Sequence, residues 1–331
     1  MTPQQQQAIR EYLATVPITV QPLNNCDKLE ILVTVWHGED CVRVRISQHH
    51  ENVSLVEKNG RVLHCGAGEG SRGEEKLRVS RDCLTVEGIV EFADTVDIGL
   101  VDELLDRQVA YNMAIAEEGL RNDWGANIGS VILRRSPAPE DVRTRAKAMA
   151  AAGSDARMSG CEMPVIINSG SGNQGITVSV PVAVYAAHIG ASREQLYRAL
   201  LVSNLLAAHI KTGIGPLSAY CGAVSAGCAA GCGIAYLEGG RSDAIAHTLV
   251  NAIAITSGII CDGAKPSCAG KIAAALDAAY LGYDMYKEGQ QFYGGDGIVS
   301  KGVENTIRNI GRLGADGMTE TDKEILRIMT E

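Results

Sequence analysis

Ten cysteines are the residues of this chain best suited to chemistry, and five of them fall in its second half. Cys221, Cys228 and Cys232 are spaced i, i+7 and i+11 in a segment rich in glycine and alanine, a spacing that places them on one face of a helix. Cys261 and Cys268 follow in ICDGAKPSC, where a glycine and a proline predict a turn. Two turn thiolates and one helix thiolate would suit an iron–sulfur cluster with one open iron, although the spacing lacks the short C-x-x-C steps of ferredoxins.

Cysteines in a helix of small residues have a second explanation, because an unligated thiol behaves as a small buried hydrophobe. We favour that explanation for Cys228 and Cys232, and ligation for Cys261 and Cys268 on their polar turn. No ligand pattern surrounds the remaining cysteines, and most of them are expected to be structural: Cys26, Cys41, Cys65, Cys83 and Cys161.

A glycine-rich segment, PVIINSGSGNQGITVSVPV, matches G-x-G-x-x-G and raises the question of a dinucleotide site. That fold needs a long helix after the glycines and an acid about 20 residues on, at a strand end. Here Pro181 interrupts the expected helix, and the acid at that distance, Glu194, falls in a predicted first helical turn. An NAD-binding dehydrogenase is therefore the weaker interpretation.

The same segment suits an anion better, because exposed N–H groups at a helix N-terminus bind carboxylate or phosphate. The other interpretation is a capped turn without a ligand, which explains isolated Gly, Ser and Asn but less well a continuous run of them. The candidate substrate-binding residues are Asn168, Ser169, Gly170, Ser171, Gly172, Asn173, Gln174 and Gly175.

The helical histidines have no second metal-type residue at i+4, so they predict no zinc site. The candidate bases are lysines. Lys211, Lys265 and Lys271 could each act as a base if desolvated. Lys265 is the first choice for the catalytic base because it lies between two of the proposed ligands.

The elements that must position these residues predict an α+β fold. Residues 27–65 read as strands, with a hairpin at Asn59-Gly60, and a further short strand is expected near residues 84–90. Helical spacing follows at 101–121 and 139–153, and beyond residue 174 nearly everything is helical. We expect an α+β unit with hairpins and a linking helix over residues 1–125, then a large Ala/Gly-rich helical domain over 126–331. The later helices are expected at 192–210, 216–237, 242–257, 271–286, 299–310 and 321–329.

Composition excludes several classes of protein. The chain has 331 residues, a net charge of −9, 46% hydrophobic and 21% charged residues, which argues against disorder and against a nucleic-acid partner. Its apolar runs are too short or too interrupted to cross a membrane, and MTPQQQQ does not begin a secretory signal. We therefore expect a cytoplasmic protein whose cysteines are thiols or metal ligands rather than disulfides.

Four motifs carry a resemblance to a known family: SDARMSG, PVIINSGSGNQGITVSVPV, GPLSAYCGAV and GIICDGAKPSCAGK. From about residue 27 onward the chain resembles the L-cysteine desulfidases, which are related to the alpha chain of iron–sulfur L-serine dehydratases. The resemblance implies a [4Fe–4S] cluster and β-elimination from L-cysteine or L-serine, giving pyruvate, ammonia and sulfide or water. It assigns the cluster ligands to Cys221, Cys261 and Cys268 and the substrate loop to residues 169–175.

One feature of that family has no counterpart here. Its members carry an N-terminal Cys-Thr-Glu-Pro stretch, and Cys26, in NNCDKLE, does not match it. The expected partners are a small amino-acid substrate and either a second copy of the chain or a complementing N-terminal module. A non-catalytic family member and a PLP-dependent lyase stay open as alternatives, as does the choice between cysteine and serine.

Overall fold

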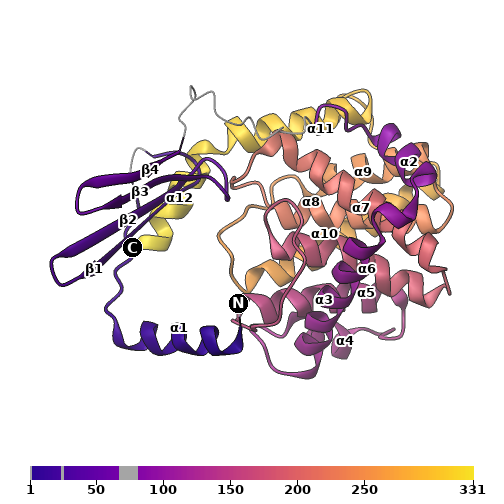
Figure 1. Ribbon diagram of the computed structural model, residues 1–331. Helices are drawn as coiled ribbons and strands as arrows, with labels where there is room; N and C mark the ends of the chain where they lie inside the picture. The colour runs from indigo at the N-terminus through magenta and orange to yellow at the C-terminus, as the bar shows by residue number, and fades with distance from the viewer. Residues whose placement is uncertain (1, 24–25, 67–80) are drawn as a thin grey trace. The chain divides into compact units, whose positions relative to one another are not determined.

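The computed structural model describes residues 2–23, 26–66 and 81–331, and it divides into two compact units (Figure 1). One unit comprises Met1–Gly66 with Lys323–Glu331, and the other comprises Ala67–Asp322. A small antiparallel sheet lies in the first unit and helices make up the second, so the predicted α+β class is confirmed.

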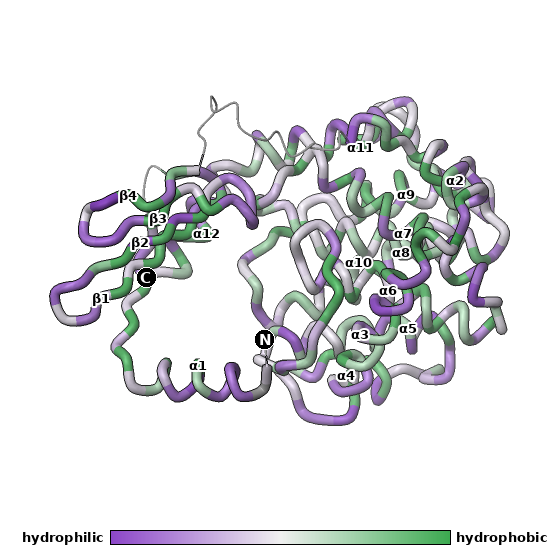
Figure 2. Tube along the Cα trace, viewed as in Figure 1, coloured by the Kyte–Doolittle hydropathy of each residue, from purple (hydrophilic) through white to green (hydrophobic). Residues whose placement is uncertain are grey.

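The first unit contains a four-stranded meander in the order β1-β2-β3-β4. Asn59 and Gly60 form the predicted tight turn between β3 and β4, with φ of 51° and 79°. Hydrophilic hairpin tips separate strand bodies that are largely hydrophobic (Figure 2), the pattern by which chain reversals are placed in solvent. The elements are α1 (Pro3–Thr15), β1 (Glu30–His37), β2 (Asp40–Ser47), β3 (Val53–Lys58) and β4 (Arg61–Cys65).

The second unit is a bundle of helices, and the last helix of the chain (Thr319–Thr330) belongs to the first unit from Lys323 onward. All six late helices predicted from the sequence are present as α7 to α12, and none of the described helices is long and apolar enough to span a bilayer. The helices are α2 (Val86–Thr95), α3 (Asp102–Arg121), α4 (Ile128–Arg135), α5 (Val142–Met158), α6 (Gly172–His188), α7 (Arg193–Ile214), α8 (Gly222–Leu237), α9 (Ser242–Thr256), α10 (Ser267–Lys287), α11 (Val303–Arg312) and α12 (Thr319–Thr330), with a short 3₁₀ turn at Ile98–Leu100 and a π turn at Leu313–Gly317.

Two local expectations were wrong. The segment expected to form a strand near residues 84–90 begins α2 instead, because the Thr85 side chain accepts a hydrogen bond from the Gly88 N–H and caps a helix. Helix α6 continues through Pro181, where an interruption was expected. Nearly every residue of α6 is buried, so packing on all sides compensates for the hydrogen bond that proline cannot donate.

The division expected at residue 125 differs from the compact units of the structure, which divide after Gly66. Helix α3, assigned from the sequence to the first unit, packs against α5 and α6 in the helical unit. The boundary between residues 1–125 and 126–331 remains a prediction.

Small residues let the central helices approach closely. Gly227 and Gly231 of α8 face α10, and a Cβ atom at Gly231 would lie 2.4 Å from the Cβ of Ala279. Almost all of α8 is buried, including Cys228 and Cys232, whose thiols contact Thr256 Oγ1 and the Ile245 carbonyl. This packing fixes the N-terminus of α8, where the first candidate ligand lies.

Candidate functional site

A single backbone bridge brings two of the candidate ligands together. Tyr220 and Ile260 pair as an isolated antiparallel bridge, and the Cys261 N–H donates to the Ala219 carbonyl at 2.6 Å. Cys221, the N-cap residue of α8, comes directly after Tyr220, and Cys261 comes directly after Ile260. The two side chains consequently lie next to each other, and each thiol affects the acidity of the other.

That contact separates the acidities of the two thiols. The neighbouring Cys221 thiol lowers the pKa of the Cys261 thiol, with the Gly263 N–H and the Lys271 charge acting in the same direction. The same interaction between the thiols, together with burial, raises the pKa of the Cys221 thiol above its usual range. Cys261 is therefore the more acidic thiol of the pair, and acidity of this kind favours a sulfur ligand or a nucleophile.

The third candidate ligand, Cys268, lies at the other end of the same turn. It is buried in the first turn of α10, and its thiol donates to the Gly263 carbonyl at 3.6 Å. Within the described residues, no three His, Cys, Asp or Glu side chains gather in a geometry that would hold a metal. The donor chemistry suits iron, but Cys268 would have to leave the Gly263 carbonyl to join the other two sulfurs.

The desolvated lysine at this site is Lys211, which the sequence named only as an alternative. It lies on α7 with 7% of its surface exposed, and burial lowers its pKa while the charges of Cys261 and Cys221 oppose that shift. Lys265, chosen from the sequence because it lies between two proposed ligands, is exposed on the turn and so does not meet the condition of desolvation. Lys271 is paired with Asp262.

The first half of the glycine-rich segment is a capped turn. Asn168 and Ser171 exchange backbone hydrogen bonds at 3.1 and 3.0 Å across Ser169 and Gly170, which have φ of 49° and 83°. The Asn168 amide donates to Asn204 on α7, and the Ser171 hydroxyl accepts from the Gln174 N–H at the start of α6. These contacts explain the turn without a ligand.

The glycines of the second half allow close packing. A Cβ atom at Gly175 would lie 1.9 Å from the Ile166 carbonyl oxygen, and one at Gly172 would lie 2.2 Å from Nε of Arg157. Gly172 therefore leaves room for an arginine side chain to lie against the N-terminus of α6.

Arg157, in the SDARMSG motif at the end of α5, is the residue that sequence reasoning missed. Its Nη1 donates to Asn173 Oδ1 at 3.4 Å, and no ion pair joins it to an acid among the described residues. Burial lowers its pKa, and the charge of Cys268 acts in the opposite direction. The usable signal was a basic residue in an alanine-rich helix with no acid three or four positions away.

Gln174 connects the glycine-rich segment to the cysteines. It is 5% exposed, and its Oε1 has no hydrogen-bond partner. A Cβ atom at Gly222, the residue after Cys221, would lie 2.6 Å from its Nε2. The N-termini of α6 and α8 thus meet beside Cys221, and both helix dipoles favour negative charge there.

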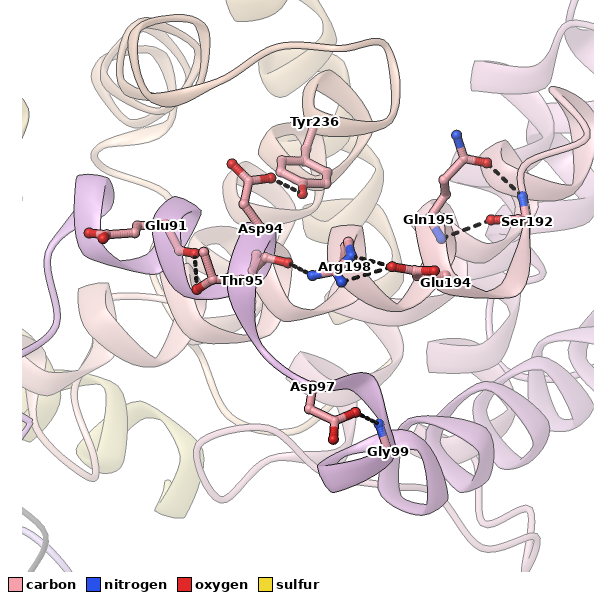
Figure 3. A network of polar contacts seen from close by, with 11 residues as sticks. Glu91, Asp94, Thr95, Asp97, Gly99, Ser192, Glu194, Gln195, Arg198 and Tyr236 are labelled. Atoms are coloured by element: carbon pink, nitrogen blue, oxygen red, sulfur yellow. Dashed lines mark hydrogen bonds and ion pairs between the residues drawn. The ribbon is translucent and has the colours of Figure 1, made fainter.

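A polar network fixes the far ends of the helices that carry Lys211 and Cys221 (Figure 3). Arg198 of α7 binds both Glu194 and the Ala93 carbonyl of α2, and Tyr236 of α8 donates to Asp94. Helix α2 therefore joins α7 to α8 away from the cysteines, which limits movement of the two helices relative to each other.

Comparison with known proteins gives a family match that includes these motifs. Residues 27–327 match the family model described as serine dehydratase alpha chain. The chain is 58% identical over 325 residues to a UPF0597 protein of Desulfitobacterium hafniense, covering 98% of this chain and 75% of the relative. It is 46% identical over 320 residues to a UPF0597 protein of Lachnoclostridium phytofermentans, covering 97% and 76%.

The names of these relatives state no reaction, and no solved structure matches the chain. The family model nevertheless extends over every motif and every candidate ligand described above. The part of the resemblance that concerns serine dehydratases is thus confirmed: this chain belongs to the serine dehydratase alpha chain family.

Proposed function

We propose that this protein is an iron–sulfur-dependent lyase that removes the β-substituent of a small amino acid. The substrate would be L-cysteine or L-serine, and the products pyruvate, ammonia and hydrogen sulfide or water. Family membership supports a lyase. The single observation that carries the proposal is the Cys221–Cys261 thiol pair, formed beside the N-terminus of α8 and within the electrostatic reach of the buried Lys211.

Cys221, Cys261 and Cys268 would hold the cluster, because thiolate sulfur is the ligand that iron–sulfur clusters take in proteins. When bound, a cluster with an open iron supplies a Lewis acid for a poor leaving group such as hydroxide or hydrosulfide. The fit is supported by the chemistry of the two sulfurs that meet and by a third buried thiol on the same turn.

The chain's own residues would bind the substrate and move its proton. The N–H groups at the start of α6 favour a carboxylate beside Gly172 and Asn173, which fixes the substrate relative to a base. Elimination needs a base for the weakly acidic Cα proton, and a lysine whose ammonium is desolvated gives up its own proton more readily. We assign that role to Lys211 rather than to the exposed Lys265.

The test is anaerobic purification followed by measurement of iron, acid-labile sulfide and pyruvate formation from L-cysteine and from L-serine. We expect Cys261→Ala to lose the iron and the activity together. Cys228→Ala is the matched control, since Cys228 is a buried cysteine outside the proposed ligand set. Iron and activity that persist in Cys261→Ala would overturn the proposal.

The same assay addresses a partner-dependent or non-catalytic role. This chain spans about three quarters of the length of its curated relatives. Activity is therefore measured for the chain alone and after mixing it with a full-length relative that carries an inactivating ligand substitution. Activity found only in the mixture would assign the chain to a complementing role.

A further inference from the structure

Two polar groups beside the cysteine pair have unused hydrogen-bonding capacity: Arg157, which is half-buried, and Gln174, which is almost fully buried. Arg157 has no acid in ion-pair contact among the residues that the structure describes, and its hydrogen bonds there leave only from Nη1. Only 5% of the Gln174 surface is exposed, yet its Oε1 accepts no hydrogen bond. Burying an amide oxygen without a donor opposes folding, and a half-buried guanidinium without a counter-charge is available to bind an anion.

Both groups are held at the first turn of α6. Arg157 lies against Gly172 and contacts Asn173, while Gln174 lies against Gly222 at the start of α8. A side chain at either glycine would displace the polar group beside it, since a Cβ would come within 2.2 Å of Arg157 Nε or 2.6 Å of Gln174 Nε2. The local sequence thus keeps space for both polar side chains next to two helix N-termini.

The two groups have complementary chemistry. A guanidinium binds a carboxylate through paired N–H groups, and helix N-termini add to that attraction. An amide oxygen only accepts hydrogen bonds, so it prefers a cationic donor such as an ammonium. A carboxylate and an ammonium attached to one carbon are the groups that define an α-amino acid.

We propose that Arg157 binds the carboxylate of the substrate and that Gln174 Oε1 accepts a hydrogen bond from its α-ammonium, so that the site selects α-amino acids over hydroxy acids. This deepens the proposed function and rests on it for the position of the substrate. The specificity comes from Gln174, because the carboxylate is common to both classes of ligand. Arg157 supplies affinity to both.

Non-reactive probes test the assignment without turnover. L-Alanine carries both groups, L-lactate replaces the ammonium with a hydroxyl, and L-alaninamide lacks the carboxylate charge. Titration calorimetry on the anaerobically purified protein should show L-alanine binding at least about 10-fold more tightly than either of the others, the effect of one charge-assisted hydrogen bond. Pyruvate formation from L-serine is measured on the same preparation.

Two substitutions separate the two roles. Gln174→Met keeps the length of the side chain and removes the acceptor, so L-alanine should fall to the affinity of L-lactate while L-lactate is unchanged. Arg157→Gln should weaken L-alanine and L-lactate together. Arg145→Gln, which changes an exposed arginine on the same helix, is the matched control. Thermal unfolding of each variant shows that the fold is retained, and Gln174→Asn serves as a second variant should Gln174→Met fail to fold.

The outcomes are distinct. A preference for L-alanine that survives in Gln174→Met, or L-lactate binding that survives in Arg157→Gln, overturns the inference, as does a wild-type protein that binds no probe. If the probes bind in the expected pattern but no pyruvate is formed, the proposed lyase function is wrong and the amino-acid binding site stands. If pyruvate is formed but the variants still discriminate between the probes as the wild type does, only the assignment of Arg157 and Gln174 is wrong.

Discussion

Cys221 and Cys261 lie next to each other although they are 40 positions apart in the sequence. The contact depends on the bridge between Tyr220 and Ile260, which places each cysteine one residue beyond a paired backbone position. The interaction between the two thiols then raises the pKa of Cys221, which burial raises further, and lowers the pKa of Cys261. A reactive sulfur therefore results from backbone pairing.

Cys268→Ala tests the third ligand. If the Cys268 thiol exchanges the Gly263 carbonyl for iron, this variant should lose iron to the same extent as Cys261→Ala. Iron and acid-labile sulfide are measured on anaerobically purified protein, with Cys232→Ala as the buried-cysteine control. A full complement of iron in Cys268→Ala would show that the remaining ligand is another residue.

Lys211→Met should lower pyruvate formation about 100-fold or more, the usual contribution of a general base. The side chain keeps its length and apolar stem, so the buried position is still filled. Calorimetry should show L-alanine binding little changed, which separates proton transfer from binding. Lys265→Met, at an exposed lysine, is the control. Loss of activity in Lys265→Met but not in Lys211→Met would show that Lys265 is the base.

Gly175→Ala should destabilise the protein by about 3 kcal/mol, because its Cβ would lie 1.9 Å from the Ile166 carbonyl oxygen and the start of α6 would have to move. Gly270→Ala on α10 is the matched control. No atom lies within 4 Å of a Cβ built there, so alanine should stabilise that helix by about 0.5 kcal/mol or more. Denaturant unfolding measures both, and equal midpoints for the two variants would contradict the packing described.

Arg143→Gln should lower the free energy of unfolding at pH 7 by about 1 kcal/mol, since Arg143 binds Asp284 through two hydrogen bonds at 2.6 and 2.9 Å on a partly exposed surface. The Arg143 hydrogen bond lowers the pKa of Asp284 below its ordinary 3.8. The pair's contribution is therefore complete above that value and is lost as the pH falls through the lowered pKa.

The measurement for this pair is a series of denaturant unfolding curves from pH 7 to pH 2. The difference between wild type and Arg143→Gln should shrink below the ordinary pKa of Asp284, while Arg145→Gln, in an exposed pair with Glu140 at 3.8 Å, should differ little from wild type throughout. A constant difference across the whole series would assign the effect of Arg143 to its packing on Tyr280 instead.

Local pattern predicted much of the fold. Strand alternation and the Asn59-Gly60 turn, and helical spacing after residue 174, depend on neighbours within one element, and the structure has those elements. Prediction failed where tertiary packing overrides local preference. Pro181 remains inside a helix that is buried along nearly its whole length, and Thr85 caps a helix where hydrophobic residues suggested a strand.

The sequence by itself determined the chemistry available to this protein: thiols on a helix and a turn, a glycine-rich segment before a buried helix, and the family they identify. Only the tertiary structure decided which groups meet. Lys211 rather than Lys265 is desolvated, Arg157 lies against Gly172, and Gln174 lies beside Gly222. Burial and close contact are set by distant segments packing together, and the spacing of residues within one segment does not encode them.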